Sequence, residues 1–168
     1  MKFTTRDIVL IALVAALYVV LTALPPFNAI AYGPIQFRIA EILNFLVFYN
    51  RRYVIAVTLG VIISNLFTSN NIVIDVIFGS LQTLITLLIA VYVFDKLFKH
   101  MLTKFLTWSV FNSIFGMAIV TWDILFFAHP TPAVFFSVWW TVALGEFVVL
   151  FIGSFIMDGL GRRIDLTK

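Results

Sequence analysis

Six apolar segments alternate with short polar breaks along the chain, and this pattern predicts six helices. A bilayer core about 30 Å thick is crossed by about 20 helical residues at 1.5 Å each, so the last three segments are long enough to span it. The second and third, at about 15 residues, need tilt, local thinning or burial against their neighbours. The longest break, residues 24–33, is predicted to be either a plain connector or a cap over the bundle. We expect helices over residues 8–24, 34–49, 53–68, 72–95, 102–127 and 133–157.

Ten of the eleven Lys and Arg residues fall into four clusters, and these clusters set the orientation of the helices. Two apolar segments separate each cluster from the next, and the breaks near Pro25, Ser69 and His129 carry no Lys or Arg. Short loops rich in Lys and Arg stay on the cytoplasmic side. The sequence therefore predicts an all-α protein of the cell membrane, a single domain over residues 1–168 with six transmembrane helices and both termini cytoplasmic. The clusters are Lys2/Arg6, Arg51/Arg52, Lys96/Lys99/Lys104 and Arg162/Arg163/Lys168.

Composition supports the same class of protein. Hydrophobic residues make up 62% of the 168-residue chain, which is more than in ordinary soluble domains. Charged residues make up 11%, which is less than in such domains. The net charge of +3 belongs to the loops predicted to face anionic lipid, so it is no indication of nucleic-acid binding. Because the chain has no cysteine, it has no disulfide, no thiolate nucleophile and no cysteine-bound metal.

Polar residues within the predicted helices are the candidates for function, because those retained in a membrane usually face the bundle interior or a cavity. Arg38, the one basic residue outside the four clusters, is followed at helical spacing by Glu41 and Asn44. Narrow polar stripes also follow the fourth, fifth and sixth helices, and the stripes converge on the outward-facing half of the bundle. The candidate site residues are Arg38, Glu41, Asn65, Asp75, Gln82, Asn112, Asp123, Trp139 and Glu146.

The charges of this set indicate the kind of ligand. One arginine among four carboxylates gives a formal charge of −3 if all ionise, which suits a donor-rich or cationic small molecule. Each of these residues has a structural role as its alternative. Arg38 and Glu41 would form an ion pair within one helix, and Asp75 and Asp123 would be hydrated groups near the membrane interface. Trp139 would anchor its helix at that interface.

The residues of an enzyme active site are nearly absent. Neither His100 nor His129 belongs to a metal-binding pair such as HExxH, and no serine has a plausible base beside it in the sequence. The phosphate-binding pattern G-x-x-x-x-G-K-[ST] does not occur, so the chain is not expected to hydrolyse ATP itself. We therefore expect no enzyme, no cofactor and no metal site.

Four parts of the chain form a specific pattern: Tyr32–Glu41 (YGPIQFRIAE), Asn44, Leu59–Asn65 and Ile74–Ser80 (IDVIFGS). They resemble the signature of the QueT-type family of substrate-binding components, and the resemblance extends over nearly the whole chain. The family often has serine where this chain has Ala40, a small departure that leaves the Arg38/Glu41 pair in place.

The resemblance implies an S component of an energy-coupling factor (ECF) transporter, with six helices, cytoplasmic termini and a pocket in the outward half. Such components associate with a transmembrane coupling protein and two ATP-binding cassette ATPases, so a partner would hydrolyse ATP. Their first helix typically carries small residues at four-residue spacing that dock on the coupling protein. Here Ala12 and Ala16 stand at that spacing, with Ala15 beside them. Packing of these alanines inside the bundle is the alternative.

The substrates that the resemblance implies are queuosine precursors, which are 7-deazaguanines. Their guanine-like edge offers a ring N–H and an exocyclic NH₂, and a carboxylate accepts such a pair bidentately. Glu41 and Asp75 are the first candidates for this contact, with Glu146 and Asp123 next. The candidates for a hydrogen bond to the carbonyl edge of the base are Asn65, Gln82 and Asn112. Trp139 is a candidate for stacking on its ring. The alternative functions are an S component for another vitamin or nucleobase, a self-sufficient carrier, and a small membrane enzyme or assembly subunit.

Overall fold

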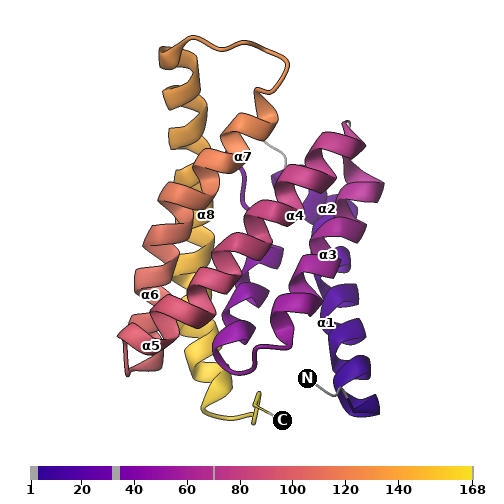
Figure 1. Cartoon of the computed structure of the whole chain (residues 1–168), viewed down its shortest axis with the longest axis vertical. Helices are drawn as coiled ribbons and strands as arrows, with labels where there is room; N and C mark the ends of the chain where they lie inside the picture. The colour runs from indigo at the N-terminus through magenta and orange to yellow at the C-terminus, as the bar shows by residue number, and fades with distance from the viewer. Residues whose placement is uncertain (1–3, 32–34, 70, 168) are drawn as a thin grey trace.

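The computed structural model describes residues 4–31, 35–69 and 71–167, and every regular element within these ranges is a helix (Figure 1). The prediction of an all-α protein is confirmed. In chain order the elements are α1 (Thr5–Ala23), α2 (Pro25–Ala31), the 3₁₀ helix η1 (Ile39–Phe48), α3 (Tyr53–Thr68), α4 (Ile72–Ile89), the π-helical η2 (Ala90–Phe94), α5 (Asp95–Leu97), α6 (Met101–Phe111), the π-helical η3 (Asn112–Gly116), α7 (Met117–Ile124) and α8 (Pro132–Gly161).

Within the described residues, four helical stretches are long and apolar enough to cross a membrane: Thr5–Ala23, Ile72–Leu97, Met101–Ile124 and Pro132–Gly161. η1 and α3 are also apolar but have only 10 and 16 residues. Their lengths correspond to about 20 Å of 3₁₀ helix and about 24 Å of α-helix, which is less than the bilayer core. The apolar helical segments therefore number six, as predicted, while the count of six crossings stays a prediction.

The break predicted over residues 24–33 contains a short helix, α2, that the sequence analysis did not predict. Pro25 stands at its first position, where the missing N–H leaves no hydrogen bond unmade. The amides of Phe27 and Asn28 donate to the carbonyl of Leu24 at 3.0 and 2.8 Å and close the first turn. Two consecutive prolines, which usually indicate a loop, here start a helix.

The second predicted helix begins later and is wound more tightly than expected. Its predicted start, Pro34, lies outside the described residues; residues 35–38 are not helical, and η1 begins at Ile39. Eight of the ten residues of η1 are buried, so neighbouring helices surround it. Side chains three residues apart stack in a 3₁₀ helix, which brings Glu41 and Asn44 together, whereas Arg38 precedes the helix. The single α-helical face predicted for these three residues is therefore corrected.

π-helical turns interrupt two of the predicted long helices. η2 follows α4, and η3 joins α6 to α7. A π-helical turn adds a residue and rotates the residues after it relative to those before it. Asn112, at the start of η3, is fully buried, whereas Asp123 on α7 is partly exposed. The continuous stripe predicted for the fifth helix is therefore broken at η3.

The largest hydrophobic cluster fixes η1 against α6. Phe45, Phe105 and Trp108 have no exposed surface, and the Phe45 ring centroid lies 4.6 Å from that of Phe105 and 5.7 Å from that of Trp108. The Trp108 indole N–H donates to the carbonyl of Thr86 at 3.2 Å, which ties α6 to α4. This packing holds η1 in place, and the first turn of η1 carries Glu41.

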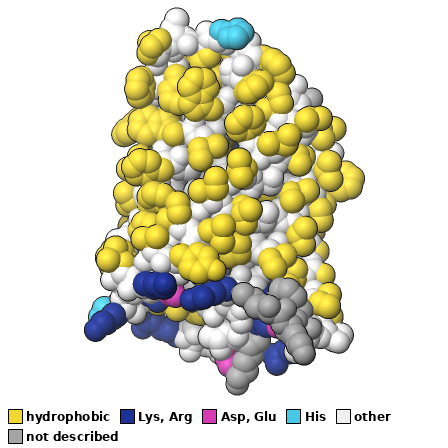
Figure 2. All heavy atoms as spheres, in the orientation of Figure 1, with side chains coloured by type: hydrophobic (Ala, Val, Ile, Leu, Met, Phe, Trp, Pro, Cys, Tyr) yellow, Lys and Arg dark blue, Asp and Glu magenta, His cyan; other side chains and the backbone are white. Residues whose placement is uncertain are grey.

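Lys and Arg side chains gather in a band at one end of the molecule, and the surface above the band is largely hydrophobic (Figure 2). α1 begins and α8 ends at this same end (Figure 1). Ion pairs join several of the basic side chains to carboxylates there: Arg52 to Asp7, Lys104 to Asp95 at 2.5 Å, and Arg162 to Asp158 at 2.7 Å. The described residues of the four clusters thus lie at one end, as a cytoplasmic face requires, while the side of the membrane stays a prediction.

Cysteine labelling tests that orientation. Ala128→Cys, in the exposed turn after α7, should react with an impermeant maleimide added to intact cells. Thr167→Cys, at the basic end, should react only after the membrane is permeabilised, because the bilayer then no longer shields it. The chain has no cysteine of its own, so each signal reports one position. Labelling of Thr167→Cys in intact cells, or of Ala128→Cys only in permeabilised ones, would contradict the predicted orientation.

Candidate functional site

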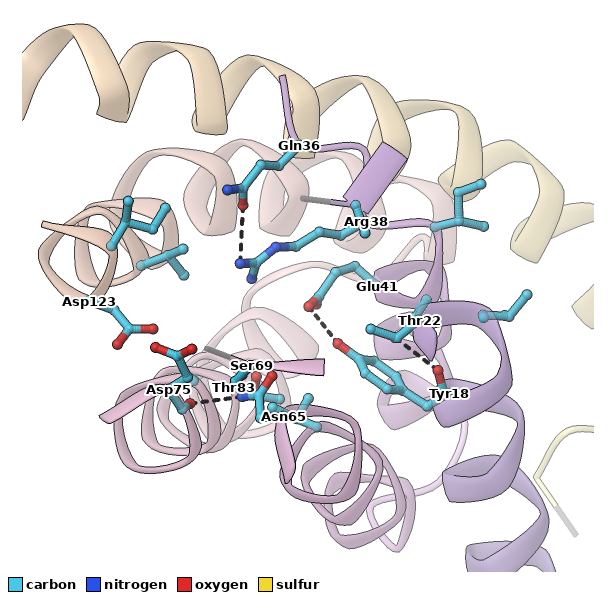
Figure 3. Close-up of a pocket in the computed structure, with 18 of the residues that line it drawn as sticks. Tyr18, Thr22, Gln36, Arg38, Glu41, Asn65, Ser69, Asp75, Thr83 and Asp123 are labelled. Carbon is cyan, nitrogen blue, oxygen red and sulfur yellow. Dashed lines mark hydrogen bonds between the residues drawn. The ribbon is translucent and has the colours of Figure 1, made fainter. Parts of the chain in front are cut away.

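A cavity of about 180 Å³ lies among α1, α3, α4, α7 and the segment that leads into η1 (Figure 3). Tyr18 and Thr22 line it from the last turns of α1, and α1 begins at the basic end. The cavity is therefore in the half of the molecule away from the basic band. Its polar lining residues are Tyr18, Thr22, Gln36, Arg38, Glu41, Asn65, Ser69, Asn71, Asp75, Thr83 and Asp123.

Arg38 projects into this cavity from the non-helical segment before η1 (Figure 3). Its guanidinium donates from Nη2 to Oε1 of Gln36 at 3.2 Å. The backbone of Gln36 lies so close to α8 that a Cβ at Gly145 would overlap its carbonyl group. A glycine on α8 is thus what lets the segment approach, and this approach places Arg38.

Glu41 is nearly inaccessible, with 2% of its surface exposed, and both carboxylate oxygens accept hydrogen bonds. Oε1 accepts from the Tyr18 hydroxyl at 2.7 Å, and Oε2 accepts from the side-chain amide of Asn44. The Tyr18 bond joins η1 to α1, and the Asn44 bond follows from the stacking of residues i and i+3 in a 3₁₀ helix. Glu41 is therefore a cavity-lining carboxylate that the protein already holds in place.

Asp75 and Asp123 reach the cavity from α4 and α7, and their carboxylates point toward each other (Figure 3). Oδ1 of Asp123 is buried and has no hydrogen-bond partner among the described residues. Asn65 lies beside the pair and donates from Nδ2 to the backbone carbonyl of Asp75 at 2.8 Å. A Cβ at Gly79 would lie 2.6 Å from that Nδ2, so this glycine makes room for the asparagine. Two facing carboxylates repel each other unless a proton, a cation or a ligand's donors lie between them.

Three predicted site residues lie behind the cavity rather than on its surface. Gln82, Asn112 and Glu146 are buried, and none of them lines the cavity. Asn112 donates to Oε1 of Glu146 at 3.0 Å, and Gln82 donates to Oδ1 of Asn112 at 3.3 Å. These three residues are connected to one another, and Gln82 is adjacent to Thr83, which does line the cavity.

Trp139 is not brought to the cavity, so the prediction that it stacks on a ligand there is not supported by its position. Its indole N–H donates to the backbone carbonyl of Ile114 at 2.9 Å, and its ring lies near those of Phe136 and Trp140. These contacts make it part of an aromatic cluster on α8. Aromatic rings of this kind are enriched where a membrane protein meets the headgroup region.

The three alanines of α1 separate into two environments. Ala12 and Ala16 are exposed, whereas Ala15 is 5% exposed. The backbone carbonyl of Ala15 lies against α3, 3.2 Å from where a Cβ of Gly60 would be. The exposed face of α1 therefore carries Ala12 and Ala16 but not Ala15, which packs inside the bundle.

Sequence reasoning missed six polar residues of the lining: Tyr18, Thr22, Gln36, Ser69, Asn71 and Thr83. Tyr18 and Thr22 are spaced by one helical turn within the otherwise apolar α1, and this i, i+4 pair was a usable signal. The others gave no such signal: Gln36, Ser69 and Asn71 lie outside the helices, and Thr83 is one of two threonines on α4. The predicted residues that do line the cavity are Arg38, Glu41, Asn65, Asp75 and Asp123.

The charged lining consists of one guanidinium and three carboxylates. Carboxylates accept hydrogen bonds, and a guanidinium only donates them. The charged groups of the lining thus comprise three acceptors and one donor. This combination suits a small molecule with several N–H groups and a single acceptor edge.

Gly145→Ala tests how the Arg38 segment is held. The added methyl group overlaps the Gln36 backbone, and such overpacking typically costs about 1–3 kcal/mol. We expect the melting temperature of the detergent-purified protein to fall by several degrees. Gly159→Ala on the same helix is the matched control, because no atom lies within 4 Å of its added Cβ. Equal melting temperatures for the two variants would show that α8 does not position this segment.

Comparison with known proteins gives two matches that agree. Residues 8–162 match the sequence profile of a family described as "QueT transporter". The chain is 49% identical over 174 residues to the queuosine precursor transporter QueT of Lactococcus lactis subsp. cremoris (strain MG1363), and the alignment covers 99% of each chain. No solved structure matches the chain.

Proposed function

The chain belongs to the QueT transporter family, and we propose that it is the substrate-binding component of an ECF importer for a queuosine precursor. The observation that carries the proposal is the pair of facing carboxylates, Asp75 and Asp123, in a cavity in the half away from the basic band. A protein 49% identical over its whole length is a queuosine precursor transporter, which supports the substrate class. The family description supports transport rather than catalysis.

The donor edge of a 7-deazaguanine complements this carboxylate pair. Its ring N–H and exocyclic NH₂ bind one carboxylate in two parallel, charge-assisted hydrogen bonds. The donors of the substrate thereby bind against Asp75 and Asp123 and relieve the repulsion between these carboxylates.

Arg38 and the size of the cavity complete the complementarity. The guanidinium donates to the ring carbonyl of the base, which is the acceptor on the same edge. Pockets for drug-sized ligands enclose roughly 300–1,000 Å³, so a cavity of about 180 Å³ suits a single bicyclic base. Glu41 closes the inner side near Arg38, where Tyr18 and Asn44 hold its carboxylate.

Delivery of the substrate to the cytoplasm needs partners that hydrolyse ATP, because the chain has no phosphate-binding loop of its own. We assign the exposed face of α1 to the transmembrane coupling protein, which two ATP-binding cassette ATPases would drive. Ala12 and Ala16 lie one turn apart on this face, with Leu13 and Leu17 exposed beside them. Small residues at this spacing let two membrane helices approach closely.

Asparagine substitutions test the carboxylate pair. Asp75→Asn and Asp123→Asn each replace an acceptor oxygen with a donor that faces the substrate's own donors. Losing one partner of a buried charge-assisted contact typically costs about 2–5 kcal/mol, so calorimetry should show 7-deazaguanine binding weakened by roughly 30-fold or more. Glu41→Gln should also weaken binding, and it should lower the melting temperature because Glu41 holds Tyr18 and Asn44.

Asp158→Asn is the matched control, because this carboxylate pairs with Arg162 at the basic end, far from the cavity. It should bind 7-deazaguanine like the parent protein. If folded Asp75→Asn and Asp123→Asn also bind like the parent, the two carboxylates are structural and the substrate site lies elsewhere.

Tryptophan substitutions test the docking face. Ala12→Trp and Ala16→Trp should abolish most uptake of the precursor by cells with the coupling protein and ATPases, because the bulky ring prevents close helix approach. Binding of 7-deazaguanine by the solitary purified variants should persist. Ala133→Trp, at another exposed alanine, should leave uptake intact. Normal uptake by both α1 variants in a complex of unchanged composition would exclude this face.

A further inference from the structure

A buried polar network continues inward from the wall of the cavity. The Thr83 hydroxyl donates to Oε1 of Gln82 at 3.2 Å, and Gln82 in turn donates from Nε2 to Oδ1 of Asn112 at 3.3 Å. Asn112 donates from Nδ2 to Oε1 of Glu146 at 3.0 Å. All four side chains are at most 2% exposed, and of the four only Thr83 lines the cavity.

The hydrogen bonds of this network all run in one direction, from the cavity wall toward Glu146. Asn112 turns its NH₂ toward Glu146 and its oxygen toward Gln82. Gln82 turns its NH₂ toward Asn112 and its oxygen toward Thr83. The single proton of the Thr83 hydroxyl is therefore used inside the protein. Toward the cavity, Thr83 presents lone pairs and no donor.

Packing keeps the two amides in these orientations. The network passes Gly116 in the π-helical η3, where a Cβ would lie 2.5 Å from Oδ1 of Asn112 and 2.8 Å from Nε2 of Gln82. The two amide groups thus occupy the space that a side chain at 116 would take. A buried amide in such a confined place rotates only if it breaks hydrogen bonds that nothing else there replaces.

Thr83 lines the cavity two helical turns further along α4 than Asp75. Both residues, with Gly79 between them, line it from α4 at four-residue intervals. Eight residues of α-helix correspond to about 12 Å, which exceeds the reach of one edge of a bicyclic base. A base whose donor edge binds Asp75 and Asp123 therefore directs its opposite end, the pyrrole ring, toward Thr83.

We propose that Thr83 accepts a hydrogen bond from the pyrrole N–H of the base and thereby selects the free base over forms substituted at that nitrogen. This inference rests on the proposed function. A nucleoside carries its sugar on that nitrogen, so it lacks the donor and must also place the sugar against the buried wall formed by Gln82 and Asn112.

Calorimetry with two isosteric ligands tests the acceptor without a change in shape. One ligand is 7-deazaguanine, and the other is its furo analogue, in which a ring oxygen replaces the pyrrole N–H. The parent protein should bind the pyrrole compound about tenfold or more tightly than the furo compound, because two acceptors face each other in the latter. The nucleoside 7-deazaguanosine should bind more weakly still. Equal affinity for the pyrrole and furo compounds would overturn the inference.

Three variants separate Thr83 from the network behind it. Thr83→Val should weaken binding of the pyrrole compound about tenfold and abolish the preference, whereas Thr83→Ser, which keeps the hydroxyl, should retain both. Gln82→Met removes the internal acceptor, so the Thr83 proton can turn toward the cavity and the preference should fall to about threefold or less. Melting temperatures establish that each variant is folded. An unchanged preference in Thr83→Val or in Gln82→Met would contradict the inference.

The same titrations distinguish this inference from the proposed function. If the parent protein binds no 7-deazaguanine, the proposed substrate is wrong. If it binds 7-deazaguanine but accepts the furo analogue or the nucleoside equally well, the proposed function stands and Thr83 has no part in selectivity.

Discussion

The structure depends on the need of buried polar groups for partners inside the protein, since hydrocarbon offers them none. The bonds that meet this need also join the helices. Glu41 accepts from Tyr18 and so ties η1 to α1, and Glu146 accepts from Asn112 and ties α8 to η3. The Trp108 indole ties α6 to α4 in the same way. Asp75 and Asp123 instead point their carboxylates toward each other at the wall of a cavity, and this arrangement marks the place where a ligand's donors fit.

The same constraint explains the irregular elements. η1 is surrounded by other helices, so its short 3₁₀ winding exposes little backbone to lipid while it brings Glu41 and Asn44 together. η3 presents Asn112 to both Gln82 and Glu146, and Gly116 leaves the space for that contact. π-helical turns of this kind are frequent at functional sites. Here the irregular turns place the polar side chains, and the regular helices enclose them.

The sequence predicted the helical class, six apolar segments and the family, because long apolar runs and a specific signature are local properties. It also predicted five lining residues, since polar groups on helices expected to span a membrane are few. It did not predict α2, the 3₁₀ winding of η1 or the turn at η3, which depend on packing against other helices. For that reason it could not distinguish Asp123, on the cavity, from Glu146 and Gln82, behind it. Trp139 lies away from this cavity, and the sequence could not show this because an aromatic residue at helical spacing fits an interface as well as a pocket.

The most direct test of the account is an experimental structure of the purified protein with bound 7-deazaguanine. We predict the base in the cavity beside Asp75 and Asp123, with its ring N–H and NH₂ toward a carboxylate and its carbonyl toward Arg38. A base bound outside this cavity, or one whose carbonyl edge faces the two carboxylates, would contradict the account.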